Sequence, residues 1–235
     1  TGFTQGTGTM VTGATVNPHA LSGLTAETTY DFYVRADCGA EQSTWTGPAS
    51  FTTPCAVVTP DYTQDFASYL DSCWSEATGA TTPTGTTSEW ETDGFANVGT
   101  TGAAKFNIFG TGGDEWLVSP TFDLSSRGYE INLDVALTNW NTTTSGTIGP
   151  DDAVYVMQSI DDGTTWTTAY TWDASNSPSN TGDNVTIDIS TVTSATVKFA
   201  IFALEGSSSG GDLDFFVDNF AVQARPASNW SGATS

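Results

Sequence analysis

The most regular hydrophobic pattern in the chain predicts a β-hairpin. Residues 153–159 (AVYVMQS) alternate, with two valines on one face of the expected strand and Tyr155 and Met157 on the other. The sequence Asp-Asp-Gly at 161–163 supplies a tight turn, and residues 165–172 return in β-branched and aromatic side chains. Because both faces are apolar, we expect this hairpin to lie in a sheet that a second sheet covers on one side.

The remaining elements after residue 61 also have the pattern of strands. No ten-residue window carries the apolar stripe of a helix, and turns rich in Gly, Ser, Asn and Asp separate the strands at the spacing of an all-β sandwich. The expected strands are 104–109, 115–119, 129–137, 185–189, 197–203 and 213–222. The fold class that this pattern predicts is an all-β, antiparallel jelly-roll β-sandwich.

The first 54 residues have a different pattern of short strands and turns. The segment LSGLTAETTYDFYVRADCG at 21–39 resembles the second half of a fibronectin type III module, and WTGPASFTT at 45–53 resembles its last strand. The front half of such a module is absent. Either its strands lie on another piece of chain, or this region packs against the neighbouring module. A coincidental set of short strands is the alternative.

These patterns divide the chain into four parts. We expect a partial fibronectin type III-like module at 1–54, a linker at 55–60, a jelly roll at 61–223, and a tail or linker to a next module at 224–235. The chain opens abruptly, so we interpret it as an excerpt of a longer exported protein, with neighbouring modules of that protein as partners.

The charge balance excludes several classes of partner. The chain has 27 Asp and Glu against 5 Lys and Arg, a net charge of −22, which repels nucleic acid and anionic membranes and attracts divalent cations. No apolar run has the length of a transmembrane segment, so we expect no membrane insertion and no nucleic-acid binding.

The three cysteines indicate an oxidising compartment. Cys55 and Cys73 closely flank one segment and are expected to form a disulfide, which leaves Cys38 over. No Cys-x-x-Cys motif or Cys/His cluster indicates a zinc or redox site. We therefore expect a secreted or cell-surface protein.

A set of landmarks after residue 61 resembles the MAM-like and cleaved-adhesin jelly rolls of exported Bacteroidetes proteins. The most specific are WLVSPTFDLS at 116–125 and VDNFAV at 217–222, and the resemblance extends over residues 61–223. It implies a non-catalytic adhesive or ligand-binding role, often with structural calcium. MAM-like domains usually carry Glu just after the first Phe, where this chain has Ala67, so the corresponding site here would need Asp65 instead.

The last expected strand carries a separate argument for a metal. If Phe216, Phe220 and Val222 face the core, strict alternation places Asp218 on the same face. A buried carboxylate needs compensation, and calcium binds carboxylate and carbonyl oxygens in irregular geometry. Asp65 and Asp93 are the expected further ligands, because the first and last strands of a jelly roll commonly run side by side. The alternative is a β-bulge that turns this carboxylate out to water.

Three tryptophans and one asparagine are candidates for binding a glycan. Trp90, Trp140 and Trp172 lie next to loops, so they can present ring faces to a sugar, and Asn141 belongs to the loop that we favour as a binding rim. The tryptophans at positions 74, 116 and 166 are expected in the core.

The remaining acidic residues carry weaker hypotheses. The pairs at 151–152 and 161–162 are interpreted as solvated turn residues, with a second calcium site as the alternative. Glu89, Glu91 and Asp93 would share one face of an extended strand, and paired carboxylates of this kind can hydrolyse glycosides.

The residues therefore favour a non-catalytic module of a larger secreted protein. We expect an adhesive or carbohydrate-binding role at the cell surface, stabilised by Ca²⁺, with a neutral glycan or a protein as the partner. A structural spacer in a multidomain array or filament is the main alternative, and a glycoside hydrolase is a further one.

Overall fold

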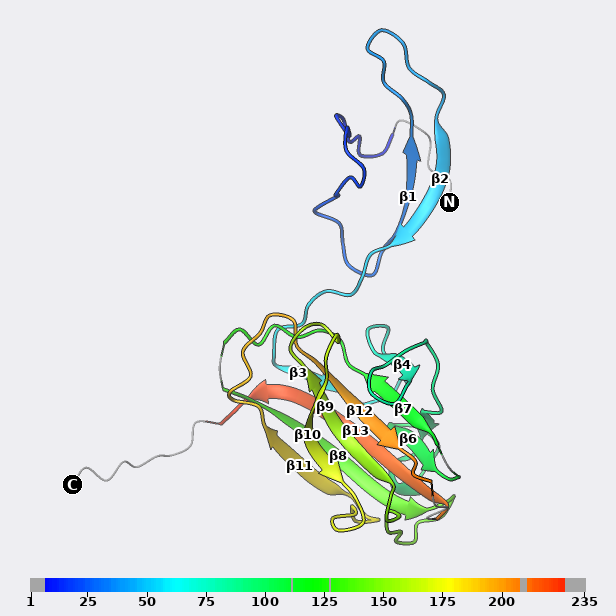
Figure 1. Cartoon of the computed structure of the whole chain (residues 1–235), viewed down its shortest axis with the longest axis vertical. Helices are drawn as coiled ribbons and strands as arrows, with labels where there is room; N and C mark the ends of the chain where they lie inside the picture. The colour runs from blue at the N-terminus through cyan, green and yellow to red at the C-terminus, as the bar shows by residue number, and fades with distance from the viewer. Residues whose placement is uncertain (1–6, 111, 127, 208–210, 227–235) are drawn as a thin grey trace, which may run out of the picture. The chain divides into compact units, whose positions relative to one another are not determined.

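The computed structural model describes residues 7–110, 112–126, 128–207 and 211–226, and it divides the chain into two compact units (Figure 1). The units are residues 1–56 and 57–235, and the division falls inside the segment expected as a linker. Most of the expected tail at 224–235 lies outside the described residues.

The first unit contains one small sheet. Strands β1 (Thr29–Val34) and β2 (Thr46–Thr52) pair in antiparallel fashion, and Tyr30 stacks on Phe51 with ring centroids 5.9 Å apart. No side chain among residues 7–56 is fully buried. The likeness to a fibronectin type III module stays a prediction.

The second unit is a sandwich of two antiparallel sheets, as the sequence predicts. The five-stranded sheet has the order β10 (Thr167–Trp172), β9 (Ala153–Ser159), β12 (Lys198–Leu204), β7 (Asp114–Val118) and β4 (Ser75–Thr78). The six-stranded sheet has the order β11 (Asp183–Asp188), β8 (Tyr129–Asn139), β13 (Leu213–Ala224), β6 (Ala103–Ile108) and β5 (Glu91–Asp93), and β3 (Tyr62–Gln64) also pairs with β13. The expected hairpin is confirmed as β9 and β10.

The main core lies between the two sheets. Alternate residues of each strand point into it, such as Val154 and Val156 of β9 and Phe215 and Val217 of β13. Each fully buried side chain of this kind stabilises the fold by about 1.5–3 kcal/mol relative to exposure. In Figure 1 the long strand β13, drawn in orange-red, passes through the middle of the six-stranded sheet between β8 and β6.

A 3₁₀ turn covers part of the outer face of the six-stranded sheet. This turn, η1 (Phe95–Asn97), packs Phe95 against Phe216 with ring centroids 6.3 Å apart. Strand β13 is therefore buried on both faces, with Phe215 in the main core and Phe216 under η1.

This arrangement corrects the expected orientation of Asp218. The expectation that Phe216 and Val222 share one face is wrong, because a register shift follows Asp218 and Asn219 has a φ of 48°. The β-bulge that was the alternative is therefore present: it turns Phe220 and Val222 into the main core, and Asp218 stays on the outer face with Phe216, half-buried.

Cys55 and Cys73 are both disulfide-bonded, as expected, and Cys38 is a free, exposed cysteine. The described part of the chain contains no helix that is long and apolar enough to cross a membrane.

Candidate functional site

The outer face of the five-stranded sheet carries a continuous row of aromatic rings. Strand register places Tyr155, Phe202 and Trp116 opposite one another on β9, β12 and β7. Phe202 stacks on Trp116 at 4.3 Å and on Tyr155 at 5.8 Å, with interplanar angles of 24° and 21°. Trp166, from the turn between β9 and β10, continues the series at 5.3 Å from Trp116. We call these four residues the aromatic row.

The two ends of the aromatic row are accessible, whereas its middle is buried. Phe202 and Trp116 are buried, and Tyr155 and Trp166 are half-buried. The indole N–H groups are satisfied internally, since Trp116 Nε1 donates to Gly79 O at 2.5 Å and Trp166 Nε1 donates to Gly163 O at 3.0 Å. These bonds fix both indoles, so the row presents ring surface in a set orientation.

A groove of about 490 Å³ lies beside Trp166. Its apolar lining includes Ala77 and Val118, which belong to β4 and β7, and its polar lining includes Glu76, Asp162 and Lys198. One aromatic wall with a few polar groups around an apolar floor is the composition of small-molecule sites in proteins.

The polar groups of the groove are held in place by neighbours. Lys198 Nζ lies 3.1 Å from Asp162 Oδ1, which also accepts a hydrogen bond from Thr121 Oγ1 at 2.8 Å. Burial alone would raise the pKa of Asp162, but the hydrogen bond from Thr121 and the contact with Lys198 lower it below the ordinary value. Glu76 Oε1 accepts a hydrogen bond from Tyr69 Oη at 2.6 Å.

The turn that carries Trp166 is organised by Asp161. Asp161 accepts hydrogen bonds from Thr165 N and Thr165 Oγ1 at 2.8 and 2.7 Å, and from Ser159 Oγ at 2.7 Å. The bonds from Thr165, followed by the bond from Ser159, lower the pKa of Asp161 to about 2. These contacts support the interpretation of this acidic pair as turn residues.

Two of the three tryptophans predicted to bind a glycan are in the core. Trp90 is 3% exposed and packs on Phe106, and Trp172 is 2% exposed and packs on Phe215. The prediction that they present ring faces is therefore wrong: a position beside a loop did not bring either indole to the surface. Trp140 is 52% exposed, as that prediction requires.

Trp140 and Asn141 lie away from the groove, at the end of β8 in the six-stranded sheet. Asn141 is exposed and has a φ of 51°, and its backbone N–H donates to Asp214 Oδ2 at 2.7 Å. The sequence interpretation predicted none of the groove's lining residues as glycan ligands, and Trp166 was expected in the core. The signal that could have found it is its place three residues after the Asp-Asp-Gly turn.

The structure brings two of the three predicted metal ligands toward each other. Strand β3 lies beside β13, as expected of first and last strands, and the charge of Asp65 acts on Asp218. Burial first, and then the charges of Asp134 and Asp65, raise the pKa of Asp218 above its ordinary value. Within the described residues, these three carboxylates do not bring ligand oxygens within 4.8 Å of one another, so they form no ready-made cage.

The third predicted ligand, Asp93, is occupied by a cation of the protein itself. Lys105 Nζ lies 2.9 Å from Asp93 Oδ2 and 2.9 Å from Glu91 Oε1. Asp93 is therefore not available as a calcium ligand in this arrangement, and Glu91 and Asp93 serve a buried lysine rather than forming an acid and nucleophile pair. Glu89 precedes β5, and its backbone N–H donates to Glu115 Oε2.

The comparisons with known proteins identify the fold. No family model matches the chain, and no curated protein matches it. Among solved structures, the chain is similar to the K1 cleaved adhesin domain of Lys-gingipain from Porphyromonas gingivalis W83. The identity is 16%, with 71% of this chain and 99% of that one covered and a TM-score of 0.50.

Two further solved structures match with TM-scores below 0.50. The K3 cleaved adhesin domain of the same protein is 13% identical, with coverage of 69% and 98% and a TM-score of 0.45. A structure of carbohydrate-binding modules from the β-sandwich superfamily is 13% identical, with coverage of 83% and 74% and a TM-score of 0.45. At these identities the likeness concerns the fold, so the function has to be argued from this chain's own residues.

Proposed function

We propose that this protein is a non-catalytic saccharide-binding module that acts outside the cell, in an adhesive role. The observation that carries this proposal is the aromatic row, whose partly exposed end at Trp166 forms the wall of a groove with hydrogen-bonding groups. The disulfide and the adhesin-like fold support an extracellular location.

The groove suits a neutral sugar for two physical reasons. The apolar C–H face of a pyranose packs on an indole ring, and Asp162, Glu76 and Lys198 supply acceptors and a donor for its hydroxyl groups. The net charge of −22 disfavours anionic polysaccharides, which leaves neutral glycans as the preferred ligand class.

The test is glycan binding by the whole chain and by one variant of the groove. Trp166→Ala removes the wall of the groove, and we expect affinity for neutral oligosaccharides, found by array and measured by calorimetry, to fall about tenfold or more. Trp140→Ala is the matched control, since it removes an exposed indole from the other sheet, and it should bind as the unmodified chain does.

Two results would contradict the proposal. Binding that survives Trp166→Ala but is lost in Trp140→Ala would move the saccharide site to the other sheet. Absence of binding to every neutral glycan would favour the structural spacer. Sugar release that is abolished by Glu91→Gln would be needed to support a hydrolase, and the ion pair with Lys105 argues against it.

We also propose that calcium stabilises the second unit through the carboxylates near Asp218. The basis is the repulsion that Asp218 experiences from Asp134 and Asp65, which a divalent cation would relieve once it drew the side chains together. Thermal unfolding with calcium and then with excess chelator tests this, because a ligand of the folded state raises stability by RT ln(1 + [L]/Kd). Asp218→Asn should abolish any calcium-dependent rise in melting temperature. If calcium does not change the melting temperature of the unmodified chain, the calcium proposal is wrong.

A further inference from the structure

Two exposed aromatic residues flank a carboxylate at one end of the six-stranded sheet. Leu213 of β13 pairs with Ile108 of β6 on one side and with Asn139 of β8 on the other. The residues that adjoin this row, Phe109, Asp212 and Trp140, therefore lie next to one another. We call these three residues the rim.

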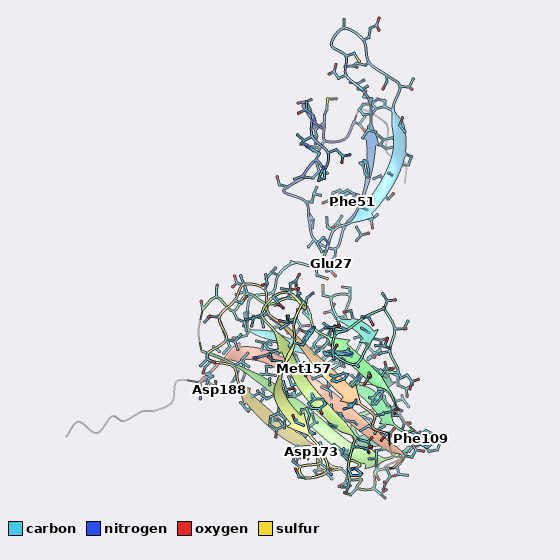
Figure 2. The ribbon with its side chains drawn as sticks, in the orientation of Figure 1. Glu27, Phe51, Phe109, Met157, Asp173 and Asp188 are labelled. Carbon is cyan, nitrogen blue, oxygen red and sulfur yellow. The ribbon has the colours of Figure 1, made fainter. Side chains whose placement is uncertain are left out.

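The spacing of the rim follows from the sheet. Trp140 N donates to Asp212 O at 2.9 Å, which continues the pairing of β8 and β13 by one residue. Adjacent strands are about 4.8 Å apart, so the backbones of Phe109 and Trp140 are separated by about 10 Å. Figure 2 shows Phe109 at one end of the second unit, with Asp188 at the opposite end.

Both rings of the rim are available to a ligand. Phe109 is 63% exposed and Trp140 is 52% exposed, and neither stacks on another aromatic ring of the described residues. Asp212 Oδ1 accepts a hydrogen bond from Asn107 Nδ2 at 3.0 Å, whereas Oδ2 accepts none from the described part of the chain.

The surroundings of the rim are strongly anionic. Phe109 N donates to the buried carboxylate of Glu205 at 2.8 Å, and the residue after Trp140 donates to the buried carboxylate of Asp214. Each lysine and arginine described in residues 57–226 is already ion-paired with a carboxylate: Lys105 with Glu91 and Asp93, Lys198 with Asp162, and Arg225 with Asp188. None of these three described side chains is therefore left over to pair with the rim.

We propose that the rim binds a cationic side chain, preferentially arginine, of a partner protein. The faces of aromatic rings attract cations, and a planar guanidinium can stack on an indole while it donates paired hydrogen bonds to a carboxylate. The rim combines both kinds of group on a protein whose net charge of −22 attracts basic partners from a distance. This proposal does not depend on saccharide binding at the groove.

The loop that carries Trp140 is held in place before any ligand arrives. Asn97 Nδ2 donates to Thr142 O at 2.9 Å and to Asp214 Oδ2 at 3.0 Å, and Asn141 N donates to the same carboxylate oxygen at 2.7 Å. A preformed loop loses less conformational entropy on binding, which favours affinity.

The test compares an N-acetylated tetra-arginine peptide with its uncharged tetra-citrulline analogue, by calorimetry on the full chain. We expect the arginine peptide to bind and the citrulline peptide to bind far more weakly. Trp140→Ala and Asp212→Asn should each weaken arginine binding by about fivefold or more. Trp166→Ala, in the groove, and Asp188→Asn, which removes one negative charge at the opposite end of the unit, should leave it within about twofold.

Three outcomes would overturn the proposal. Equal weakening by Asp188→Asn and Asp212→Asn would show attraction to the net charge alone. Unchanged arginine binding in Trp140→Ala and Asp212→Asn would place the cation elsewhere. If Trp140→Ala loses binding to neutral glycans but keeps binding to arginine, the rim is a saccharide site. Glycan binding by Trp166→Ala then shows whether the groove binds saccharides as well.

Discussion

Two carboxylates on the outer face of β13 have opposite environments. Asp214 is 0% exposed, yet it accepts hydrogen bonds from Asn97 Nδ2, Asn107 Nδ2 and Asn141 N, so its charge is compensated. From the residues that the structure describes, Asp218 accepts one hydrogen bond, from Asn219 N at 2.6 Å, and it faces the charges of other carboxylates. The first therefore holds a loop in place, whereas the surroundings of the second disfavour its charged form.

The stability of the protein should depend on pH through Asp218. Burial, with the charges of Asp134 and Asp65, raises the pKa of this carboxyl in the folded state, so folding disfavours its charged form and stability increases as pH falls through that pKa. In chelator at pH 7 to 8, we expect Asp218→Asn to raise the melting temperature by about 2 °C, and the difference should vanish at low pH, where the native residue is protonated.

Asp188→Asn is the matched control, with the opposite expected sign. Hydrogen bonds from Ser190 and then the charge of Arg225 lower the pKa of Asp188, so its charge favours the folded state. A lower melting temperature for Asp218→Asn at neutral pH would contradict the proposed repulsion.

The sequence predicted a carboxylate at Asp218 that faces the core, whereas the structure places it half-buried on the outer face of the sheet. Strict alternation was applied through LDFFVDNFAV, and it failed because Phe215 and Phe216 are both buried, in separate layers, and because a bulge at Asn219 shifts the phase. Neither the cover that η1 provides nor the bulge leaves a periodic signal in the sequence, since both depend on residues distant in the chain.

At the scale of elements, the turn between β9 and β10 determines the position of Trp166, which forms the wall of the groove. Asp161 does not line the groove, but its bonds to Thr165 and Ser159 shape the turn from which Trp166 emerges. We predict that Asp161→Ala weakens saccharide binding, measured by calorimetry, because it loosens the position of Trp166. Asp173→Ala, which removes a turn carboxylate that does not line the groove, is the control and should bind normally.

The carboxylate of Asp161 in this turn should stay ionised in mild acid. Because the pKa of Asp161 is lowered to about 2 in the folded state, its stabilising contribution is present above the ordinary value and is lost as pH falls toward 2. A carboxyl titration by NMR should give a midpoint about two pH units below the ordinary value of an aspartate. A midpoint close to 4 would show that the bonds from Thr165 do not persist in solution.

The strands themselves were predictable because local sequence determines their pattern. The expected ranges at 129–137 and 213–222 agree with β8 and β13 within two residues at each end. The aromatic row was not predictable, because Tyr155, Phe202 and Trp116 are adjacent only through the register of three strands that are far apart in sequence. Both apolar faces of the hairpin were evident in the sequence, but what the outer face packs against was not.

At the scale of the molecule, burial differs sharply between the two units. Residues 57–226 enclose a core between two sheets, whereas no described side chain before residue 57 is fully buried. The sequence anticipated this contrast, since the expected module at 1–54 lacks its front half. A two-stranded sheet without a buried face is at best marginally stable in water.

Amide hydrogen exchange on the intact chain should therefore separate the two units. We predict that amides of β1 and β2 exchange with opening free energies close to zero, whereas amides of β8 and β13 exchange only through global unfolding. The exposed hydrophobic side chains Phe32 and Val34 give the physical reason, since β1 buries too little apolar surface to offset the entropy of ordering. Strong protection of β1 and β2 would mean that further strands pair with them in solution, and it would support the partial fibronectin type III interpretation.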